Sequence, residues 1–376
     1  MKKYFWYNEI SEKFLERGYF HKHNSIEKRV EEIADTVGKY FPEVRDKVKD
    51  YIELGYYIIP SPVWSNFGTN RGSGISCFNT HIGDSMESII KGAAEVGYLC
   101  KVGGGTSGYF GEIREEGAPI STGGIADGPM KYLELFDSMK KIVNQGAFRR
   151  GEFAAFLDID HPDIEEFLKI NREDSKFQRL PYGVCIDDKW IKSMKEGDID
   201  KRSIWTKVLE NRSYTGFPYI FFTDNVNNNT VDCYKDNNIK IKSTNMCSEI
   251  LLASNEEESF VCNLMGMNLA LYDHWKHTDA VRVAVYIADA VLQDFIEKNE
   301  NIQLIERAVK FARKYRALGI GASGYHTYLQ ENGIPFESVT ARILNKQIFK
   351  TIRDESYAAS EEMFKKYATY QRKENS

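Results

Sequence analysis

The sequence has no long hydrophobic run, few prolines and few cysteines. Its 376 residues include 9 prolines and 6 cysteines, and no apolar stretch approaches the ~20 residues of a membrane span. The first residues, MKKYFWYNEI, lack the apolar core of a signal peptide. A basic excess is also absent, because the net charge is -5, whereas nucleic-acid binding needs a clustered basic face. We therefore expect a cytoplasmic protein that binds neither a membrane nor a nucleic acid.

The cysteines form no CxxC pair and no dense framework, which excludes a small disulfide-stapled domain. They lie at positions 77, 100, 185, 233, 247 and 262. In a reducing compartment an isolated cysteine is usually a small, buried hydrophobic residue. A chemical role for any of them therefore needs evidence from its neighbours.

Several common catalytic motifs are missing as well. Neither a GxSxG elbow nor an HExxH sequence occurs. Cys77 and His81 could begin a zinc site, but no second ligand pair with suitable spacing exists, so we expect no bound metal. GGGTSG (103–108) matches GxGxxG, but the polar, glycine-broken stretch YFGEIREEGAP follows it, where a dinucleotide-binding fold needs a helix. We interpret 103–108 as a mobile loop whose backbone can approach a nucleotide.

What is present is an alternation of strand-like and helical segments. Residues 1–55 are expected to be helical, and the loop IPSPVWSNFGTNRGSG follows. Strands are predicted at GISCFNT, FAAFLDI, YGVCID, YIFFTD and FVCNL. Asp84 is the expected N-cap of the next helix, and from about residue 278 the chain reads as helices at 279–298, 303–318 and 339–367. This pattern favours an α/β fold, with a helical segment (1–55) before one catalytic domain (56–376).

One short stretch, NMCSE, concentrates reactive groups. Asn245, Cys247 and Glu249 occupy every second position, so an extended chain would point all three side chains the same way. Glu249 is a candidate general base, and the Asn245 amide, which both donates and accepts, suits a vicinal diol. Cys247 could be a nucleophile or a hydrogen-atom donor. Two alternatives stay open: a cysteine hydrolase, which would need a histidine base, and an ordinary loop that turns inward.

The same stretch resembles the N-x-C-x-E finger-loop motif of the ribonucleotide reductase catalytic (large) subunit. Five further stretches resemble this family in the same order: PSPVWSNFGTNRGSGISC, GDSMESI and GEIREEGAPISTGG of the effector region, FVCNLMGMNLA, and RALGIGASGYHTYL. The resemblance covers roughly residues 50 to 365. It implies a ten-stranded α/β barrel built of two half-barrels, with the finger loop in its centre, of which this chain would hold the first half.

The resemblance also implies a set of catalytic roles. Cys247 matches the cysteine that becomes a thiyl radical and abstracts the 3′-hydrogen of the ribose. Glu249 matches the residue that takes the 3′-hydroxyl proton, and Asn245 matches one that hydrogen-bonds the ribose hydroxyls. Cys77 and Cys262 match the redox pair that closes a disulfide as the 2′-hydroxyl leaves.

Binding residues and partners are implied in the same way. Ser61 and Ser76 match substrate-contacting positions, and Asp84 and Arg114 match positions that contact a dNTP or ATP effector at the specificity site. Ser121 stands where many members carry a second arginine. The implied partners are a homodimer mate, a small subunit whose metal centre generates the radical, ribonucleoside diphosphates, and thioredoxin or glutaredoxin. No cofactor is expected to be bound directly by this chain.

The family's second half and an ATP-cone domain have no counterpart in this sequence. We therefore expect either a truncated chain or one part of a split enzyme that a complementary C-terminal polypeptide completes. One alternative is the cobalamin-dependent class of the same family, which shares the finger loop. Another is a non-catalytic regulatory fragment that binds the effector without turnover.

Overall fold

A computed structural model describes residues 2–20, 22, 25–145 and 150–374. The chain divides into two compact units, and each is described by itself. The first unit comprises residues 1–76, 263–298 and 316–376, and the second comprises residues 77–262 and 299–315.

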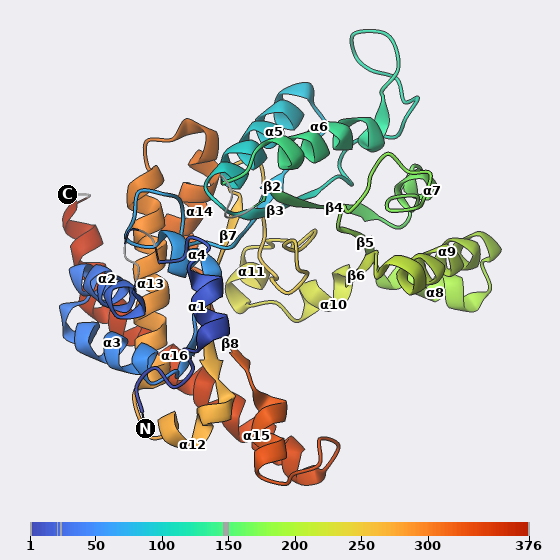
Figure 1. Ribbon diagram of the computed structural model, residues 1–376. Coiled ribbons are helices and arrows are strands. Elements are labelled where there is room, and N and C mark those ends of the chain that lie inside the picture. Colours follow the sequence, from blue (N-terminus) through green and yellow to red (C-terminus); the bar gives the residue numbers. More distant parts are fainter. Residues whose placement is uncertain (1, 21, 23–24, 146–149, 375–376) are drawn as a thin grey trace. The chain divides into compact units, whose positions relative to one another are not determined.

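The first unit is mainly helical (Figure 1). Its elements are α1 (Glu9–Leu15), α2 (Ile26–Tyr40), η1 (Pro42–Val44), α3 (Arg45–Glu53), β1 (Tyr57–Ile58), α4 (Ser61–Asn66), most of β7 (Phe260–Asn268), η2 (Leu269–Leu271), α12 (Tyr272–Trp275), α13 (Ala280–Asn299), β8 (Leu318–Ser323), α15 (Tyr325–Glu331) and α16 (Val339–Glu374). β7 pairs antiparallel with β1 and parallel with β8. The helices predicted within residues 1–55 are present.

A buried arginine explains a helix that was not predicted in the Pro- and Gly-rich loop. The side chain of Arg29 on α2 is fully buried and donates to the carbonyls of Val63 and Phe67 at 2.9 Å and of Trp64 at 2.8 Å. These carbonyls belong to α4 and its C-cap, and the last carbonyls of a helix lack intrahelical donors. Arg29 therefore satisfies the end of a short helix that is too short to be stable alone.

The second unit contains a parallel sheet covered by helices. Its elements are β2 (Cys77–His81), α5 (Met86–Lys101), β3 (Gly105–Tyr109), α6 (Gly128–Ile142), β4 (Glu152–Asp158), α7 (Ile164–Phe167), β5 (Tyr182–Ile186), α8 (Asp188–Glu196), α9 (Ile199–Thr215), β6 (Tyr219–Phe222), α10 (Thr223–Asn228), α11 (Asp232–Asp236), the first three residues of β7, η3 (Gln303–Ile305) and α14 (Glu306–Tyr315).

Strands β2 to β6 pair in chain order, and every one of these pairs is parallel. The start of β7 pairs antiparallel with the other edge of β2. α5 and α6 pack on one another and cover one face of β2, β3 and β4 (Figure 1). The run FAAFL in β4 is buried throughout, as expected for a parallel strand covered on both faces. The predicted α/β fold is confirmed.

The prediction of a mobile loop at 103–108 is wrong, because this stretch provides the strand β3 between β2 and β4. Gly104 and Gly108 are required by close packing, whereas Gly103 has a φ of 92°, which favours glycine. A Cβ atom at Gly104 would lie 2.5 Å from the Phe78 ring, and one at Gly108 would lie 2.6 Å from Ile82. Glycine lowers strand propensity, so the sequence pattern concealed a buried strand.

Other differences concern element ends. The helix predicted at 303–318 is a 3-10 turn followed by α14. β8 (Leu318–Ser323) was not predicted, because two glycines, an alanine and a serine dilute its apolar pattern. Ser85, not Asp84, caps α5: its hydroxyl accepts from the Ser88 amide at 3.1 Å. Asp84 instead binds an arginine, as described below.

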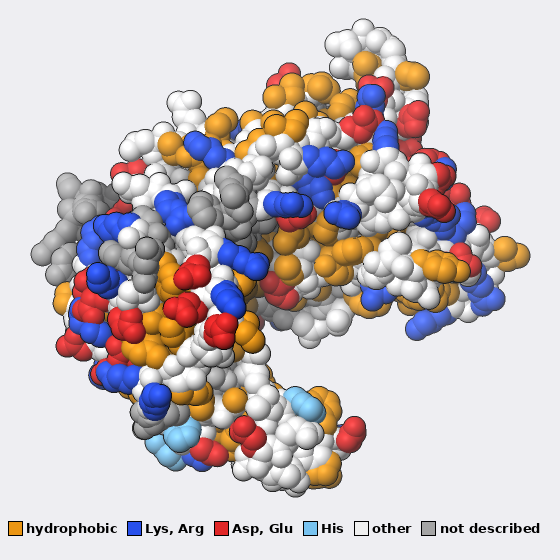
Figure 2. All heavy atoms as spheres, viewed as in Figure 1, with side chains coloured by type: hydrophobic (Ala, Val, Ile, Leu, Met, Phe, Trp, Pro, Cys, Tyr) orange, Lys and Arg blue, Asp and Glu red, His pale blue; other side chains and the backbone are white. Residues whose placement is uncertain are grey.

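Hydrophobic side chains are exposed where α5 and α6 face away from the sheet (Figure 2). Met86 and Ile90 on α5 and Leu135 and Ile142 on α6 are among the exposed large hydrophobic residues. No helix in the described part of the chain is long and apolar enough to cross a membrane.

Candidate active site

Two predicted site cysteines lie opposite each other on adjacent strands. Cys77 at the start of β2 pairs with Cys262 on β7 in the antiparallel register, and both thiols are free and buried. Directly opposed residues in such a pair have Cα atoms about 4.5–5.5 Å apart. That separation falls within the ~4.4–6.8 Å range of disulfides, so the two thiols can be joined without a backbone movement.

The stretch around Cys247 is a turn and not the extended chain predicted from its alternating pattern. The Ser248 amide donates to the Asn245 carbonyl at 3.0 Å, and Ser248 has a φ of 66°. The Asn245 side chain closes the turn, because its Oδ1 accepts from the amides of Glu249 and Ile250 at 3.0 and 2.9 Å. Asparagine commonly forms such local turns with the backbone, and these compete with extended structure.

The turn still brings an amide and a carboxylate together. Asn245 Nδ2 donates to Glu249 Oε2 at 2.8 Å, so one side chain both shapes the turn and holds the carboxylate. Asn245 is fully buried, whereas Cys247 and Glu249 are exposed. The reactive groups therefore lie on the exposed side of the turn, and the buried side of the turn is held by the protein interior.

The anchor is a set of polar side chains in the middle of the sheet. Ser107 on β3 donates to the carbonyl of Thr244 at 2.9 Å. Asn79 on β2 donates to Ser107 at 2.9 Å and to the hydroxyl of Ser243 at 3.2 Å. Sequence reasoning missed Asn79 and Ser107, and the only available signal was that both are polar residues within buried strands.

The three thiols differ in their acidity. Contact with the Cys77 thiol lowers the pKa of Cys247 to about 7, against the opposing effects of partial burial and of Glu249. The same contact, together with burial, raises the pKa of Cys77. Burial first, and then the charges of Glu249 and Cys247, raise the pKa of Cys262. At neutral pH the paired cysteines are therefore thiols, whereas Cys247 lies near its titration midpoint.

Tyr219 on β6 also lies near the turn and was not predicted from the sequence. Its pKa is raised mainly by burial and further by the charges of Cys247 and Glu249. The phenol therefore remains a protonated hydrogen-bond donor at neutral pH.

The predicted effector residues Asp84 and Arg114 are 30 positions apart in the chain, and the fold brings them into contact. Arg114 Nε donates to Asp84 Oδ2 at 2.7 Å, and the Arg114 amide donates to Asp84 Oδ1 at 3.2 Å. Ser121 lies exposed in the segment after Arg114. Asp84 and Arg114 thus form a partly exposed ion pair directly before α5.

The predicted substrate residues Ser61 and Ser76 belong to the first unit. Ser61 is the first residue of α4, and Ser76 directly precedes β2. Their contact with substrate stays a prediction. Cys77 and His81 lie at opposite ends of β2, about 13 Å apart at ~3.3 Å per residue, which is too far for two ligands of one tetrahedral ion.

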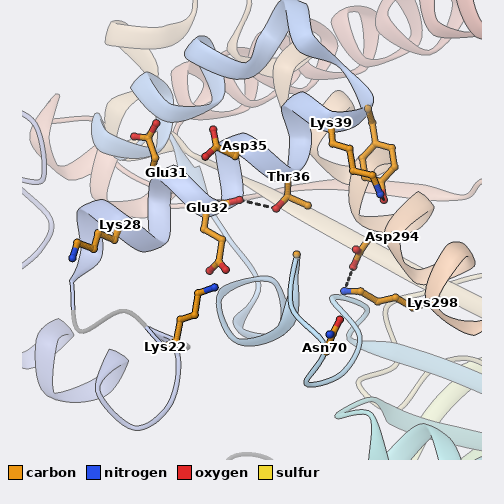
Figure 3. Close-up of a pocket in the computed structure, with 12 residues that line it drawn as sticks. Lys22, Lys28, Glu31, Glu32, Asp35, Thr36, Lys39, Asn70, Asp294 and Lys298 are labelled. Carbon is orange, nitrogen blue, oxygen red and sulfur yellow. Dashed lines mark hydrogen bonds and ion pairs between the residues drawn. The ribbon is translucent and has the colours of Figure 1, made fainter.

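A cavity of about 680 Å³ in the first unit contains none of the predicted site residues (Figure 3). Its wall combines lysines with carboxylates, so the charges largely compensate one another: Lys22, Lys28, Lys39, Lys298, Glu31, Glu32, Asp35 and Asp294. Lys298, for example, pairs with Asp294 at 2.5 Å. We assign no chemistry to this cavity.

The chain is similar to known proteins. Residues 75–199 and 192–376 match the family model "Ribonucleotide reductase, barrel domain". The chain is 31% identical over 344 residues to a ribonucleoside-diphosphate reductase large subunit of frog virus 3 (isolate Goorha), with 86% of this chain and 60% of that protein covered. It is 29% identical to a vitamin B12-dependent ribonucleoside-diphosphate reductase of Thermoplasma acidophilum, with 92% of this chain and 47% of that protein covered.

A solved structure is also similar. The Actinobacillus ureae class Id ribonucleotide reductase alpha subunit superposes with a TM-score of 0.93 at 42% identity, with 98% of this chain and 69% of that chain covered. The chain therefore spans 60% or less of the length of these two curated relatives.

Proposed function

Because the chain belongs to the ribonucleotide reductase family of catalytic (alpha) subunits, we propose that it carries the radical and redox cysteines of a ribonucleoside-diphosphate reductase. The reaction is the reduction of ribonucleoside diphosphates to 2′-deoxyribonucleotides. The observation that carries the proposal is the turn at Cys247, held by Asn245 and adjoining the opposed pair Cys77 and Cys262.

Each group has a step to perform. Cys247 as a thiyl radical takes the 3′-hydrogen of the ribose, and Glu249 takes the proton of the 3′-hydroxyl. The 2′-hydroxyl leaves as water with a proton from the pair Cys77 and Cys262. The second hydrogen of the pair goes to C2′ as its two sulfur atoms close a disulfide, and Glu249 returns its proton to the 3′-oxygen. Cys247 returns the hydrogen atom to C3′, so one nucleotide and two thiols give one deoxynucleotide, one disulfide and one water.

The acidities of the thiols support this division of roles. Cys77 and Cys262 must deliver protons together with electrons, and their raised pKa values keep them protonated. Asn245 binds the Glu249 carboxylate, which leaves the other carboxylate oxygen for a substrate hydroxyl. The disulfide is then reduced by an external dithiol such as thioredoxin or glutaredoxin, through thiol–disulfide exchange.

The radical source distinguishes two forms of the proposal. The likeness to a class Id alpha subunit favours a separate, metal-containing small subunit. The likeness to a vitamin B12-dependent enzyme favours the cobalamin class as the alternative. A requirement for adenosylcobalamin, with no need of a small subunit, would decide for the alternative, and we assign no residue of this chain to either cofactor.

Regulation and assembly are proposed from the surface of the second unit. A dNTP or ATP effector binds beside the ion pair Asp84–Arg114, and the exposed apolar residues of α5 and α6 contact a second copy of the chain. The chain spans 60% of its frog virus relative, so we also propose that a complementary C-terminal polypeptide completes the barrel. In this arrangement residues 1–55 form an N-terminal segment and residues 56–376 the incomplete catalytic domain.

The test is a reconstitution. The chain is mixed with the small subunit, a complementary C-terminal polypeptide, dithiothreitol and a nucleoside diphosphate, and deoxynucleotide is measured. Wild type should turn over and Cys247→Ser should not, because an O–H bond is too strong for hydrogen-atom exchange while serine preserves the fold. Deoxynucleotide formation by Cys247→Ser at a rate near wild type would refute the radical assignment.

A further inference from the structure

A buried ion pair lies beside the redox strands and takes no part in the proposed chemistry. Glu95 on α5 and Arg307 on α14 are both almost fully inaccessible to solvent. Arg307 Nη2 donates to Glu95 Oε2 at 2.5 Å. Removing charged groups from water is expensive, and a buried pair is often no more stabilising than hydrophobic residues of the same volume. Stability alone therefore does not explain why this ion pair is buried here.

The contacts of the pair reach both strands that carry the redox cysteines. The hydroxyl of Ser259, directly before β7, donates to Glu95 Oε2 at 2.9 Å, and the Ser259 amide donates to the Arg307 carbonyl at 3.3 Å. Arg307 Nη1 donates to the carbonyl of His81, the last residue of β2, at 3.3 Å. One arginine thus connects the end of β2, the residue before β7 and a carboxylate on α5.

The backbone ladder between these strands is short. It comprises three residue pairs, Cys77 with Cys262, Phe78 with Val261 and Asn79 with Phe260. In the same register the next pair would be Thr80 with Ser259, but the ladder ends before it. At this end of the ladder, Ser259 contacts Glu95 and His81 contacts Arg307. A shift of one residue in an antiparallel pair turns each side chain to the opposite face, so the ends of a short ladder decide whether its cysteines meet.

We infer that Glu95 and Arg307 are positioning residues that hold the register of β2 and β7, and thereby the alignment of Cys77 with Cys262. The inference rests on the proposed redox role of these cysteines. It assigns to the ion pair an effect on the thiol–disulfide equilibrium and not only on stability. Glu95 and Arg307 contact neither the substrate nor the reacting sulfur atoms.

The chain offers a matched control on the same two helices. Lys91 on α5 pairs with Glu306 on α14 at 2.8 Å, and both side chains are exposed. Lys91 lies one turn before Glu95, and Glu306 directly precedes Arg307. The double variant Lys91→Gln/Glu306→Gln therefore removes an α5–α14 ion pair that does not touch β2 or the start of β7.

The experiment measures the disulfide between Cys77 and Cys262 in buffers of reduced and oxidised dithiothreitol, by alkylation and peptide mass spectrometry. No partner chain or turnover is needed. We expect Glu95→Gln to lower the equilibrium constant for disulfide formation at least tenfold, which corresponds to about 30 mV. The control variant should stay within twofold of wild type.

Ser259→Ala removes only one hydroxyl group. It replaces Glu95→Gln as the test variant if thermal unfolding shows that Glu95→Gln does not fold. We expect it to lower the constant at least threefold. Folded Glu95→Gln and Ser259→Ala with wild-type constants would overturn the inference, as would an equal decrease in the control. If wild type itself formed no disulfide between Cys77 and Cys262, the proposed redox role would fail, and the inference with it.

Discussion

The opposed cysteines Cys77 and Cys262 are held differently from Cys247. Cys77 and Cys262 lie on strands whose separation is set by the backbone ladder. Cys247 lies on a turn shaped by the side chain of Asn245 and anchored through Ser107 and Asn79. The separation of Cys77 and Cys262 is thus set by main-chain hydrogen bonds, whereas the turn depends on three side chains. Single substitutions of these three side chains should therefore disturb the turn while the cysteine pair stays intact.

The largest expected difference between Cys247 and the pair Cys77 and Cys262 is in their reactivity toward an alkylating reagent. Iodoacetamide reacts with thiolates, so at pH 8 we expect Cys247, with its pKa of about 7, to be alkylated at least tenfold faster than Cys77 or Cys262. The rate at Cys247 should rise as pH increases through 7 and then level off. Peptide mass spectrometry follows each cysteine separately.

Cys77→Ala provides the control for this contrast. It removes the thiol that lowers the pKa of Cys247, and partial burial and Glu249 both raise that pKa, so the midpoint should move up to at least the ordinary ~8.5 of cysteine. An unchanged midpoint in Cys77→Ala would show that Cys77 does not determine the acidity of Cys247.

The next effect separates the turn from the strand pair. Asn245→Ala leaves the amides of Glu249 and Ile250 without their acceptor and should lower the free energy of unfolding by about 1–3 kcal/mol. Chemical denaturation measures this loss. The Cys77–Cys262 disulfide equilibrium should stay within twofold of wild type, since the ladder does not include Asn245, whose side chain reaches the pair only through a contact with the Cys77 thiol. A large decrease in that equilibrium would mean that the turn and the pair are not held independently.

The smallest effect on stability is expected at the surface, beside α5. Asp84→Asn breaks an exposed ion pair with Arg114 and should cost at most about 1 kcal/mol, yet it should weaken dNTP binding measured by calorimetry. Ser85→Ala is the matched control, because losing the true cap of α5 costs about 1 kcal/mol without touching the proposed effector residues. Equal dNTP affinity in Asp84→Asn and wild type would argue against this effector site.

Sequence patterns located most elements of the fold for clear physical reasons. The apolar run in β4 and the capped, periodic helices are local signals. β3 was missed because Gly104, directly before it, and Gly108 within it leave room for Phe78 and Ile82, which only the packed sheet reveals. The cap of α5 was assigned one residue early, because Asp84 and Ser85 are both good caps and only the ion pair with Arg114 separates them.

The candidate site was predicted in its residues but not in its geometry. The alternating pattern suggested an extended chain, whereas the Asn245 side chain competes for the backbone amides and produces a turn. Asn79 and Ser107 could not be singled out, because their role depends on the register of β2 with β3. The Glu95–Arg307 pair joins residues 212 positions apart and leaves no local signal.

The antiparallel junction of β2 and β7 also sets an order of events during synthesis of the chain. Strands β2 to β6 pair in the order in which they leave the ribosome, but the outer edge of β2 is completed from much later residues. The hydroxyl of Ser254, for example, donates to the Asn79 carbonyl from 175 positions away. At ~5–20 residues per second, this edge waits on the order of 10–35 s for its partner. A nascent chain therefore carries an open strand edge with Cys77 at one end, and that edge needs protection from other chains until β7 has been made.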